Sequence, residues 1–487
     1  MPTIDEIATF AKKKGFVFPS AEIYGGMAGF YDYGPLGSEM VMKIKNLWWK
    51  SIVHDRENVV GINGSIIGSE AVWNASGHVA NFIDVVAFCK KCKLKIKVDK
   101  HEIGKAKCDC GALYENLGEF NPMFSTEVGV IKSEAVKAYL RPETAQTIFI
   151  NFKNVLDTSR VKLPFGIAQI GKAFRNEISP RNFLFRMREF EQMELEFFTH
   201  PDKKNDCPIF EEVEKVKVNV LTAKEQAGTG KMESMTMGDL LKKKIIKTKW
   251  HAYWIGYRYN WYLDLGVNPE KLRLREHVPE ELSHYSAATW DIDYEYPIGW
   301  KELEGNADRT DYDLQQHTKS SKVDLSYYDE DTKERVIPHV VSEPSAGVDR
   351  VFLTLLMDAY HEEEVKGETR IVLKLHPDVA PFKVAILPLV KKDGLSEKGK
   401  EVFNNLKQKF NSFYDESGSI GRRYRRMDEI GTPFCITVDH ESLEQDDCTL
   451  RERDSMRQIR IKIKDLSDII KKLSEGEKLE TFGKFIN

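Results

Sequence analysis

The run Phe174-Arg-Asn-Glu177, followed after a polar loop by Phe185-Arg-Met-Arg-Glu-Phe190-Glu-Gln-Met-Glu194-Leu-Glu-Phe-Phe198, decides the fold of this chain. Strand-forming residues extend from 165 to 177 and from 188 to 198, and the loop between them contains proline and asparagine. This pattern predicts two paired antiparallel strands. Because side chains alternate along a strand, one face of the second strand carries Phe190, Gln192, Glu194 and Glu196. The opposite face carries Met193, Leu195 and Phe197, which we expect in a core.

The polar face of this pair suits a nucleotide. An arginine fork clamps a phosphate, a glutamate accepts a hydrogen bond from the adenine amino group, and a phenylalanine stacks on a base. The alternative is a solvent-facing sheet with ordinary salt bridges. The apolar opposite face favours the nucleotide interpretation, because solvent-facing sheets seldom combine so much charge with such a core face.

The composition of the whole chain is that of an ordinary globular protein. Its 487 residues suffice for two or three domains, and 41% hydrophobic with 30% charged residues excludes a disordered chain. The net charge is only −4, so a nucleic-acid partner must be held by local basic patches. The N-terminus does not resemble a signal peptide, and no run of about 18 apolar residues occurs. We therefore expect a cytoplasmic protein with no membrane partner.

Two further segments precede predicted helices. Glu343-Pro-Ser-Ala-Gly-Val-Asp-Arg350 comes before apolar residues at helical spacing, so Gly347 permits close backbone approach and Arg350 in the first turn can meet an anion. A plain Pro/Gly turn that caps a core helix is the alternative. Gly34-Pro-Leu-Gly37 leads into a helix predicted around residues 43–53.

These three segments resemble motifs 2, 3 and 1 of the class II aminoacyl-tRNA synthetases. Further runs extend the resemblance to the homodimeric glycyl-tRNA synthetases over nearly the whole chain, namely Arg141-Pro-Glu-Thr-Ala-Gln146, Leu274-Arg-Glu-His277, His284-Tyr-Ser-Ala-Ala-Thr-Trp-Asp291, Gly299-Trp-Lys-Glu-Leu303 and Asp308-Arg-Thr-Asp-Tyr-Asp-Leu314. The resemblance implies an α/β (α+β) fold, with an antiparallel-sheet catalytic domain and flanking helices. It also implies an enzyme that activates glycine with ATP and Mg²⁺ to glycyl-adenylate, transfers glycine to the 3′ end of tRNA(Gly), and works as a homodimer.

The resemblance assigns roles in ATP binding. It implies that Arg175 holds the α-phosphate and Arg350 the γ-phosphate as the catalytic pair, while Glu177 accepts from the adenine amino group and Phe190 stacks on the adenine. The implied ATP-binding residues are Arg175, Asn176, Glu177, Phe185, Arg186, Met187, Arg188, Glu189, Phe190, Glu302, Leu303, Gly347, Val348, Asp349 and Arg350. Carboxylates in the 299–314 region are the expected Mg²⁺ ligands.

A glycine pocket cannot use side-chain contacts, so it must grip the ammonium and carboxylate groups and leave no room for larger substrates. Extra acidic groups are the expected sign, and Glu143, Glu194 and Glu343 match the family's ammonium site. The implied glycine-binding residues are Lys97, Glu143, Phe190, Glu191, Gln192, Met193, Glu194, Glu343, Pro344, Ser345, Ala346 and Gly347. Lys97-Val-Asp99 stands where many relatives have arginine-alanine-aspartate, and a lysine does not reproduce a bidentate fork.

The expected domains are a catalytic domain over 1–375 and an anticodon-binding α/β domain over 376–487. We expect two insertions in the first, a cysteine-containing one at about 69–127 and a largely helical one at about 200–272. In the second, Gly421-Arg-Arg-Tyr-Arg-Arg426 and Thr449-Leu-Arg-Glu-Arg-Asp454 resemble the family's anticodon-binding domain. Their arginines offer phosphate contacts and Tyr424 a stacking plane, and a solvated charge run is the alternative.

Four of the seven cysteines cluster in the first insertion as Cys89-x-x-Cys92 and Cys108-x-Cys110. The odd number and the absence of a secretion signal argue against a disulfide framework. The spacing is near that of zinc ribbons with one knuckle shortened, which predicts either a structural zinc site or four reduced thiols.

Two rival functions differ from this interpretation. Another class II synthetase, such as the prolyl or threonyl enzyme, would lack the three-glutamate set. A non-catalytic synthetase-like protein would lose the ATP-binding arginines, whereas Arg175, Glu177, Phe190 and Arg350 are all present.

Overall fold

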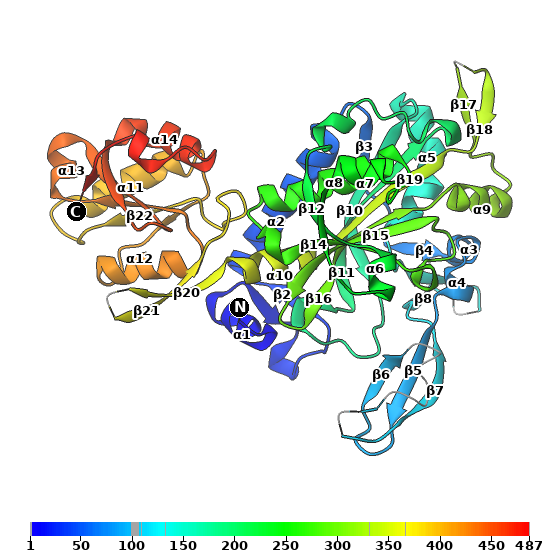
Figure 1. Ribbon diagram of the computed structural model, residues 1–487. Coiled ribbons are helices and arrows are strands. Elements are labelled where there is room, and N and C mark those ends of the chain that lie inside the picture. The colour runs from blue at the N-terminus through cyan, green and yellow to red at the C-terminus, as the bar shows by residue number, and fades with distance from the viewer. Residues whose placement is uncertain are drawn as a thin grey trace.

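The computed structural model describes residues 2–98, 107–108, 110–131, 133–330, 332–365 and 367–486, without the side chains of residues 97, 98 and 117. Figure 1 shows a larger body built around an extended sheet and a smaller body, orange to red, that contains the C-terminal helices. An arm made of β5, β6 and β7 projects from the larger body (Figure 1). This arrangement agrees with the predicted class II core and second α/β domain.

In the described part of the chain, nine strands form the main sheet in the order β13-β12-β14-β15-β16-β19-β11-β10-β3. Neighbours pair antiparallel except for β12 with β14 and β10 with β3, which are parallel. The strands are β3 (Val59–Ile62), β10 (Phe165–Phe174), β11 (Glu189–Thr199), β12 (Lys217–Leu221), β13 (Glu233–Thr236), β14 (Leu272–Glu276), β15 (Ala288–Tyr296), β16 (Gly299–Asp308) and β19 (His339–Gly347).

The predicted antiparallel pair is confirmed as β10 and β11. Ala173 lies opposite Phe190 and Gln169 opposite Glu194, so the polar residues share one face as expected. Met193 and its alternate neighbours on β11 are buried in the main hydrophobic core. β10 ends at Phe174 because the Asn176 amide donates to the Pro122 carbonyl (2.7 Å), which turns the chain away from the sheet.

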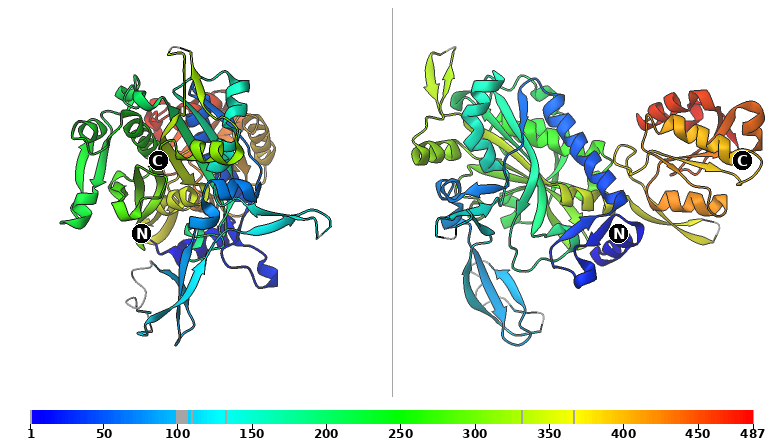
Figure 2. Two further views of the ribbon diagram at one scale, coloured as in Figure 1. Left: turned by 90° about the vertical axis from the view of Figure 1, so that its right-hand side faces the viewer. Right: turned by 180° about the vertical axis from the view of Figure 1, so that it is seen from behind.

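Helices cover both faces of this sheet. On the core face lie α2, α8 and α10, which bury apolar residues against β11, and α2 runs across the sheet in the rear view of Figure 2. On the other face, α5 packs its phenylalanines against β10 and the end of β11. The helices of this body are α1 (Ile4–Lys14), α2 (Pro35–Trp49), α3 (Glu70–Ala75), α4 (His78–Asn81), α5 (Ala145–Ser159), α6 (Ala223–Ala227), α7 (Met237–Lys242), α8 (Lys249–Asp264), α9 (Tyr312–Ser321) and α10 (Val348–Ala359).

The segment 200–272 holds α6, α7 and α8, and it also supplies β12 and β13 at one edge of the main sheet. β-branched Val218 and Val220 alternate with polar residues and are buried, which suits a strand better than a helix. The aromatic residues of α8 fill the core behind the sheet. This segment is thus part of the catalytic body and not an appended helical unit.

Smaller sheets surround the body. The arm is a three-stranded sheet in the order β6-β5-β7, and a second three-stranded sheet has the order β4-β9-β8. The remaining strands form two-stranded ribbons. Their bounds are β1 (Val17–Pro19), β2 (Tyr31–Tyr33), β4 (Ile67–Ser69), β5 (Asp84–Cys89), β6 (Lys95–Val98), β7 (Tyr114–Phe120), β8 (Ser125–Val128), β9 (Val136–Leu140), β17 (Tyr327–Asp329), β18 (Glu334–Val336), β20 (Tyr360–Val365) and β21 (Glu368–Leu373).

The C-terminal body has its own core. The main core extends to Ala380, and a separate core begins at Val384. Its sheet has the order β23-β22-β24-β25-β26-β27, and buried Arg370 ties the ribbon β20–β21 to α12 through Asp428 (3.0 Å). The elements are β22 (Val384–Pro388), α11 (Leu395–Leu406), β23 (Ser412–Tyr414), α12 (Ile420–Glu429), β24 (Phe434–Val438), α13 (His440–Gln445), β25 (Asp447–Glu452), β26 (Gln458–Lys462), α14 (Leu466–Ser474) and β27 (Phe485–Ile486). Among all the described helices, we find none that combines the length and apolar character needed to cross a bilayer.

Candidate active site

A cleft of about 360 Å³ opens on the polar face of β11 and β19. Most residues predicted to bind ATP line it, together with Leu184, Gln192 and Ser345. The predicted residues in its wall are Arg175, Glu177, Phe185, Arg186, Met187, Phe190, Glu302, Gly347, Asp349 and Arg350. The cleft therefore joins the two motifs that lie more than 150 residues apart in sequence.

Arg175 stands at the end of β10 in a fixed position. Its Nε donates to the Pro142 carbonyl (2.9 Å), and its guanidinium lies 5.4 Å from the ring centres of both Phe190 and Phe82. Because Nε is used internally, the terminal nitrogens are the ones directed to a ligand. A guanidinium beside an aromatic ring suits a phosphate linked to a stacked base.

Arg350 occupies the first turn of α10, as predicted. Its Nη1 donates to the Glu302 carboxylate (2.8 Å), and its guanidinium stacks 4.6 Å from the Phe185 ring centre. The positive charge of Arg350 lowers the pKa of Glu302. The cleft thus contains an arginine, an ionised carboxylate and an exposed aromatic face at one end.

Several predicted site residues use their side chains elsewhere. Glu191 pairs with Lys45 (3.2 Å) and Glu189 with Lys172 (3.3 Å), whereas Arg188 donates to the Glu177 carbonyl (2.9 Å). Met193, Ala346, Val348 and Leu303 are buried in the main core, Pro344 is buried within β19, and Asn176 contributes its backbone to the Pro122 contact. None of these residues is in the wall of the cleft. Lys97 lies in β6, and its side chain is outside the described part.

The three predicted glutamates converge beside this cleft. Glu194 is buried on β11 and receives hydrogen bonds from the Thr144 amide (2.9 Å), the Thr144 hydroxyl, Gln192 (2.9 Å) and Ser345 (2.7 Å). Glu143 begins the same turn as Thr144, just before α5. Four donors on one carboxylate fix its orientation and stabilise its charge.

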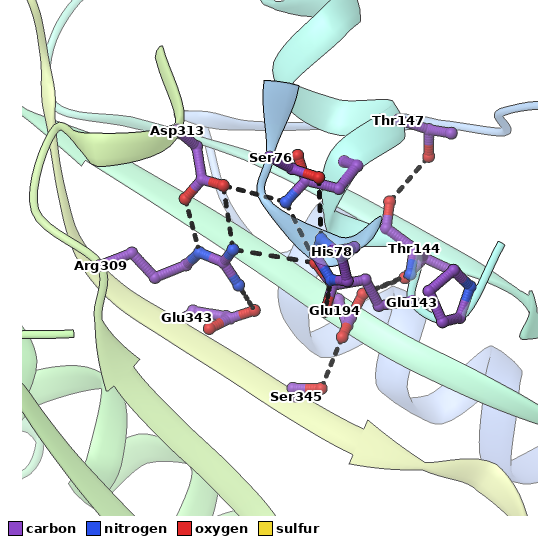
Figure 3. Close-up of polar contacts among 12 residues, drawn as sticks. Ser76, His78, Glu143, Thr144, Thr147, Glu194, Arg309, Asp313, Glu343 and Ser345 are labelled. Atoms are coloured by element: carbon purple, nitrogen blue, oxygen red, sulfur yellow. Dashed lines mark hydrogen bonds and ion pairs between the residues drawn. The ribbon is translucent and has the colours of Figure 1, made fainter. Parts of the chain in front are cut away.

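Arg309 connects the remaining carboxylates, as Figure 3 shows. It donates to Asp313 at 2.9 and 3.1 Å and to Glu343 at 2.7 Å, and it lies 3.8 Å from Glu143. The Tyr285 ring covers its guanidinium at 3.9 Å. With 1% of its side chain exposed, Arg309 is a buried cation that holds the carboxylates in one array.

Burial separates the proton affinities of these acids. Burial raises the pKa of Glu343 to about 8. The charge of Arg309 acts against this shift, whereas the negative charges of Glu194 and Glu143 add to it. Burial and repulsion from Glu143 also raise the pKa of Glu194. Although burial opposes it, the His78 ring and Arg309 hold the pKa of Glu143 below its ordinary value. One pocket therefore contains both a firmly charged and a readily protonated carboxyl group.

Glu196 extends this acidic face toward the core. Its side chain is fully buried, and neither carboxyl oxygen has a hydrogen-bond partner within the described residues. Burial and repulsion from Glu343 raise its pKa well above the ordinary value, so Glu196 is more readily protonated than an exposed glutamate.

Comparison with known proteins agrees with this geometry. Residues 129–360 match the family described as the tRNA synthetase class II core domain (G, H, P, S and T), and residues 383–473 match the anticodon binding domain. Glycine–tRNA ligase of Clostridium kluyveri is 47% identical over 96% of this chain and 98% of its own length. That of Caldanaerobacter subterraneus is 46% identical over 97% and 98%, and that of Borrelia hermsii 45% identical over 97% of each chain.

The chain belongs to the glycine–tRNA ligase family. Members of this family are aminoacyl-tRNA ligases, so the chain is an enzyme with a class II core. Among solved structures, prolyl-tRNA synthetase from Cryptosporidium parvum, complexed with L-proline and AMP, superposes with a TM-score of 0.58 at 16% identity. That match covers 97% of this chain and 75% of the other, and it supports the fold alone.

Sequence reasoning missed several residues of this ligase pocket. Arg309, Asp313 and His78 were not singled out, although Arg309 and Asp313 lie in a quoted run. An arginine flanked by acids at the end of a buried strand is the signal that would have found Arg309. His78 carries no such signal, because it lies in a segment expected to be an insertion.

The arginine run on α12 is divided between two roles. Arg423 is buried and donates to the Pro388 (2.5 Å) and Leu389 (3.1 Å) carbonyls, so its predicted contact with phosphate is wrong. Arg451 is also buried, pairs with Asp428 (2.8 Å) and stacks on Tyr424 (4.7 Å). Arg422 is exposed and Arg425 is half-buried. The helix periodicity therefore places part of the run inside the domain.

The four clustered cysteines meet at the far part of the arm. All four sulfur atoms lie within 4.8 Å of one another, with 3.4 Å between Cys89 and Cys110 and 3.3 Å between Cys92 and Cys108. None of these cysteines is in a disulfide. Four thiolates about 2.3 Å from one Zn²⁺ form a tetrahedron with edges slightly under 4 Å, so the arrangement fits zinc.

Proposed function

We propose that this enzyme activates glycine with ATP and transfers it to the 3′ end of tRNA(Gly). The observation that carries the proposal is the buried cluster of Glu143, Glu194 and Glu343 beside the cleft that contains Arg175 and Arg350. Three carboxyl groups suit an ammonium group, and a pocket filled by its own network leaves no room for a side chain. The identity of the relatives as glycine–tRNA ligases supports the same substrate.

In the proposed reaction, the glycine carboxylate attacks the α-phosphorus of ATP and pyrophosphate leaves, giving glycyl-adenylate. A ribose hydroxyl of the tRNA end then attacks the carbonyl carbon and AMP leaves. Arg175 stabilises charge on the α-phosphate, and Phe190 stacks on the adenine next to it. Arg350 holds the far phosphates, where Arg186 also lies, and Glu177 accepts from the adenine amino group. No side-chain nucleophile is required.

Class II cores use ATP with Mg²⁺, and Glu302 is the partly exposed carboxylate in the cleft that would hold the ion. Bound there, Mg²⁺ would neutralise phosphate charge. Glu302 is paired with Arg350 in the free enzyme. The pairing keeps this carboxylate ionised and in place before the nucleotide enters.

Glycine-dependent exchange of pyrophosphate into ATP tests the proposal. The purified enzyme should exchange with glycine and not with proline, threonine or alanine. Arg175→Ala should reduce exchange by about 10²- to 10³-fold, as loss of a transition-state donor does elsewhere. No exchange with any amino acid would refute the enzymatic function, and exchange with proline or threonine would refute the specificity.

The C-terminal body is proposed to bind the anticodon, over residues 376–487. Support comes from the match of 383–473 to anticodon binding domains. Exposed Arg422 remains available on α12 for backbone phosphates, since Arg423 and Arg426 are used internally and Arg425 lies 3.9 Å from Asp428. Arg422→Ala should lower tRNA charging while glycine-dependent exchange stays normal. Equal loss of both activities would contradict this assignment.

A homodimer is also proposed, in the cytoplasm, with an interface that includes the sheet β4-β9-β8. Large apolar side chains are exposed there, including Ile67 (50%), Val128 (51%) and Val136 (63%). Val128 pairs with Val136, and Ile67 pairs with Leu140. Val136 and Leu140 lie four residues apart on β9, so these side chains share one face of the sheet. Light scattering should give twice the chain mass, and Ile67→Glu should give a monomer. A monomeric parent protein would refute the proposal.

A structural zinc in the arm is proposed from the four cysteines. It would hold the tip of the arm together and supply no catalytic chemistry. Purified protein should contain one zinc per chain by atomic emission. A metal-free protein with an intact arm would show that the cysteines act only as thiols.

A further inference from the structure

The short helix α4 (His78–Asn81) covers the glycine side of the pocket, although it belongs to a segment that looked like an insertion. Its first residue, His78, is buried, and the Nε2 atom lies 3.3 Å from Oε2 of Glu143. Trp73 and Phe82 contact the His78 ring edge-on, with centroids 5.4 and 5.7 Å away. Figure 3 shows His78 between Ser76 and Glu143. The ring is thus fixed on both faces.

The contacts determine which nitrogen carries a proton. The Ser76 hydroxyl oxygen lies 2.8 Å from Nδ1 of His78 and 3.3 Å from the Trp73 carbonyl. If the hydroxyl donates to Nδ1, the neutral ring has its N–H on Nε2. If it donates to Trp73, Nδ1 must itself donate, and a bare Nε2 would then set a lone pair against the ionised Glu143. In every arrangement that avoids this repulsion, Nε2 carries a proton and donates it to Glu143.

Glu143 depends on few other donors. Its Oε1 receives a hydrogen bond from Gln146 (3.1 Å) and lies 3.8 Å from Arg309, whereas the donor to Oε2 is His78. Without His78, the carboxylate can rotate about its terminal bond and lose its alignment with Glu194 and Glu343. A carboxylate held by a charge-assisted bond at each oxygen keeps its free lone pairs aimed in one direction.

We propose that His78 is a positioning residue for glycine, which fixes Glu143 for the substrate ammonium group and links the pocket to the base of the arm. The proposal rests on the function proposed above. Asn121, directly after β7, donates from Nδ2 to the His78 (3.1 Å) and Val79 (3.2 Å) carbonyls. Its neighbour Pro122 accepts from the Asn176 amide (2.7 Å) beside Arg175. The base of the arm therefore holds α4 over one half of the active site and the motif 2 loop over the other.

The test measures KM for glycine, KM for ATP and kcat in pyrophosphate exchange. His78→Ala should raise KM for glycine about tenfold, the usual effect of removing a donor to a charged group, with KM for ATP unchanged. His78→Gln places an amide N–H near the position of Nε2 and should return KM for glycine to within about threefold of the parent value. This rescue separates donation from mere packing, because alanine and glutamine both remove the ring.

Asn121→Ala tests the link between the pocket and the arm, since Asn121 holds α4 but does not itself reach the pocket. It should raise KM for glycine about threefold, and it should add nothing further in a protein that already carries His78→Ala. Equal effects of His78→Ala and His78→Gln, or parallel increases in both KM values, would overturn the positioning role. An absence of glycine exchange in the parent enzyme would instead refute the proposed function.

Discussion

Replacement of Arg309 by methionine is the most informative perturbation of the pocket. The change keeps an unbranched side chain that reaches about as far as Nε of the arginine, and it removes three hydrogen bonds, two to Asp313 and one to Glu343. Asp313 is 2% exposed and would keep only the Gln146 amide (2.9 Å) among its present donors. Breaking a buried ion pair by removing one partner costs about 3–5 kcal/mol. An orphaned carboxylate can instead take up a proton, which costs about 5 kcal/mol near pH 7.5 for an ordinary pKa near 4.

Both routes therefore predict a loss of about 3–5 kcal/mol in the stability of the catalytic body, and the second adds a pH signature. Each proton taken up makes the loss smaller by about 1.4 kcal/mol for every unit of pH decrease. Arg309→Met should recover about 2 kcal/mol relative to the parent enzyme between about pH 7.5 and about pH 6. Urea unfolding followed by tryptophan fluorescence measures this change, and exchange kinetics at low temperature give KM for glycine in the folded fraction.

Arg258→Met is the matched control. Arg258 pairs with Glu304 (2.9 Å) on the opposite face of the sheet, and both side chains are fully buried. This variant should lose a similar amount of stability with similar recovery in acid, yet bind glycine normally. Arg309→Met should raise KM for glycine at least tenfold, because Glu343 and Glu143 lose their common partner. A normal KM would show that Arg309 does not organise the carboxylates, whereas a loss of stability that does not shrink in acid would exclude proton uptake by the orphaned carboxylate.

Four further outcomes follow from the same structure. The KM for glycine should fall as pH rises toward about 8, the value to which burial raises the pKa of Glu343, because this acid must release its proton to face an ammonium group; Glu343→Gln should flatten that profile. In the folded state Glu343 holds a proton that the unfolded chain releases above about pH 4.5. The contribution of Glu343 to the free energy of unfolding therefore falls as pH rises from about 4.5 to about 8. Glu194→Gln should raise KM for glycine about 10- to 100-fold with little change in KM for ATP, since the amide can still accept from the Thr144 donors but has no negative charge for the ammonium group; an unchanged KM would place the ammonium elsewhere. Cys92→Ser should release zinc and expose the arm to limited proteolysis while exchange activity persists, and loss of exchange would give the cluster a role in catalysis.

Local periodicity predicted the floor of the site well. The alternation along 188–198 predicted the strand, its pairing partner and the side chains on the cleft face, because a period of two follows directly from strand geometry. The helix after Gly347 was equally readable from its apolar spacing. The three glutamates came from resemblance, and the structure brings them together.

The partners of these side chains could not be read in the same way. Arg188 and Arg186 stand in one loop and look equivalent, yet Arg188 is used by the Glu177 and Ala28 carbonyls while Arg186 faces the cleft. Arg423 lies inside its domain because it donates to three carbonyl groups, of which Pro388 and Leu389 belong to a strand end distant in sequence. Such contacts depend on which distant segments pack together in the folded chain. Periodicity within one segment has no information about that packing.

Strand β11 has both of its faces committed, one to the ligand cleft and one to the core. Gain or loss of a single residue within it would exchange the two sets, sending Glu194 into the hydrophobic interior and Met193 into the pocket. The strand itself therefore does not tolerate the insertion or deletion of a single residue. The loop between Arg175 and Arg188 lies outside the β10–β11 pairing, so a change of length there leaves the cleft face and the core face of the strand in place.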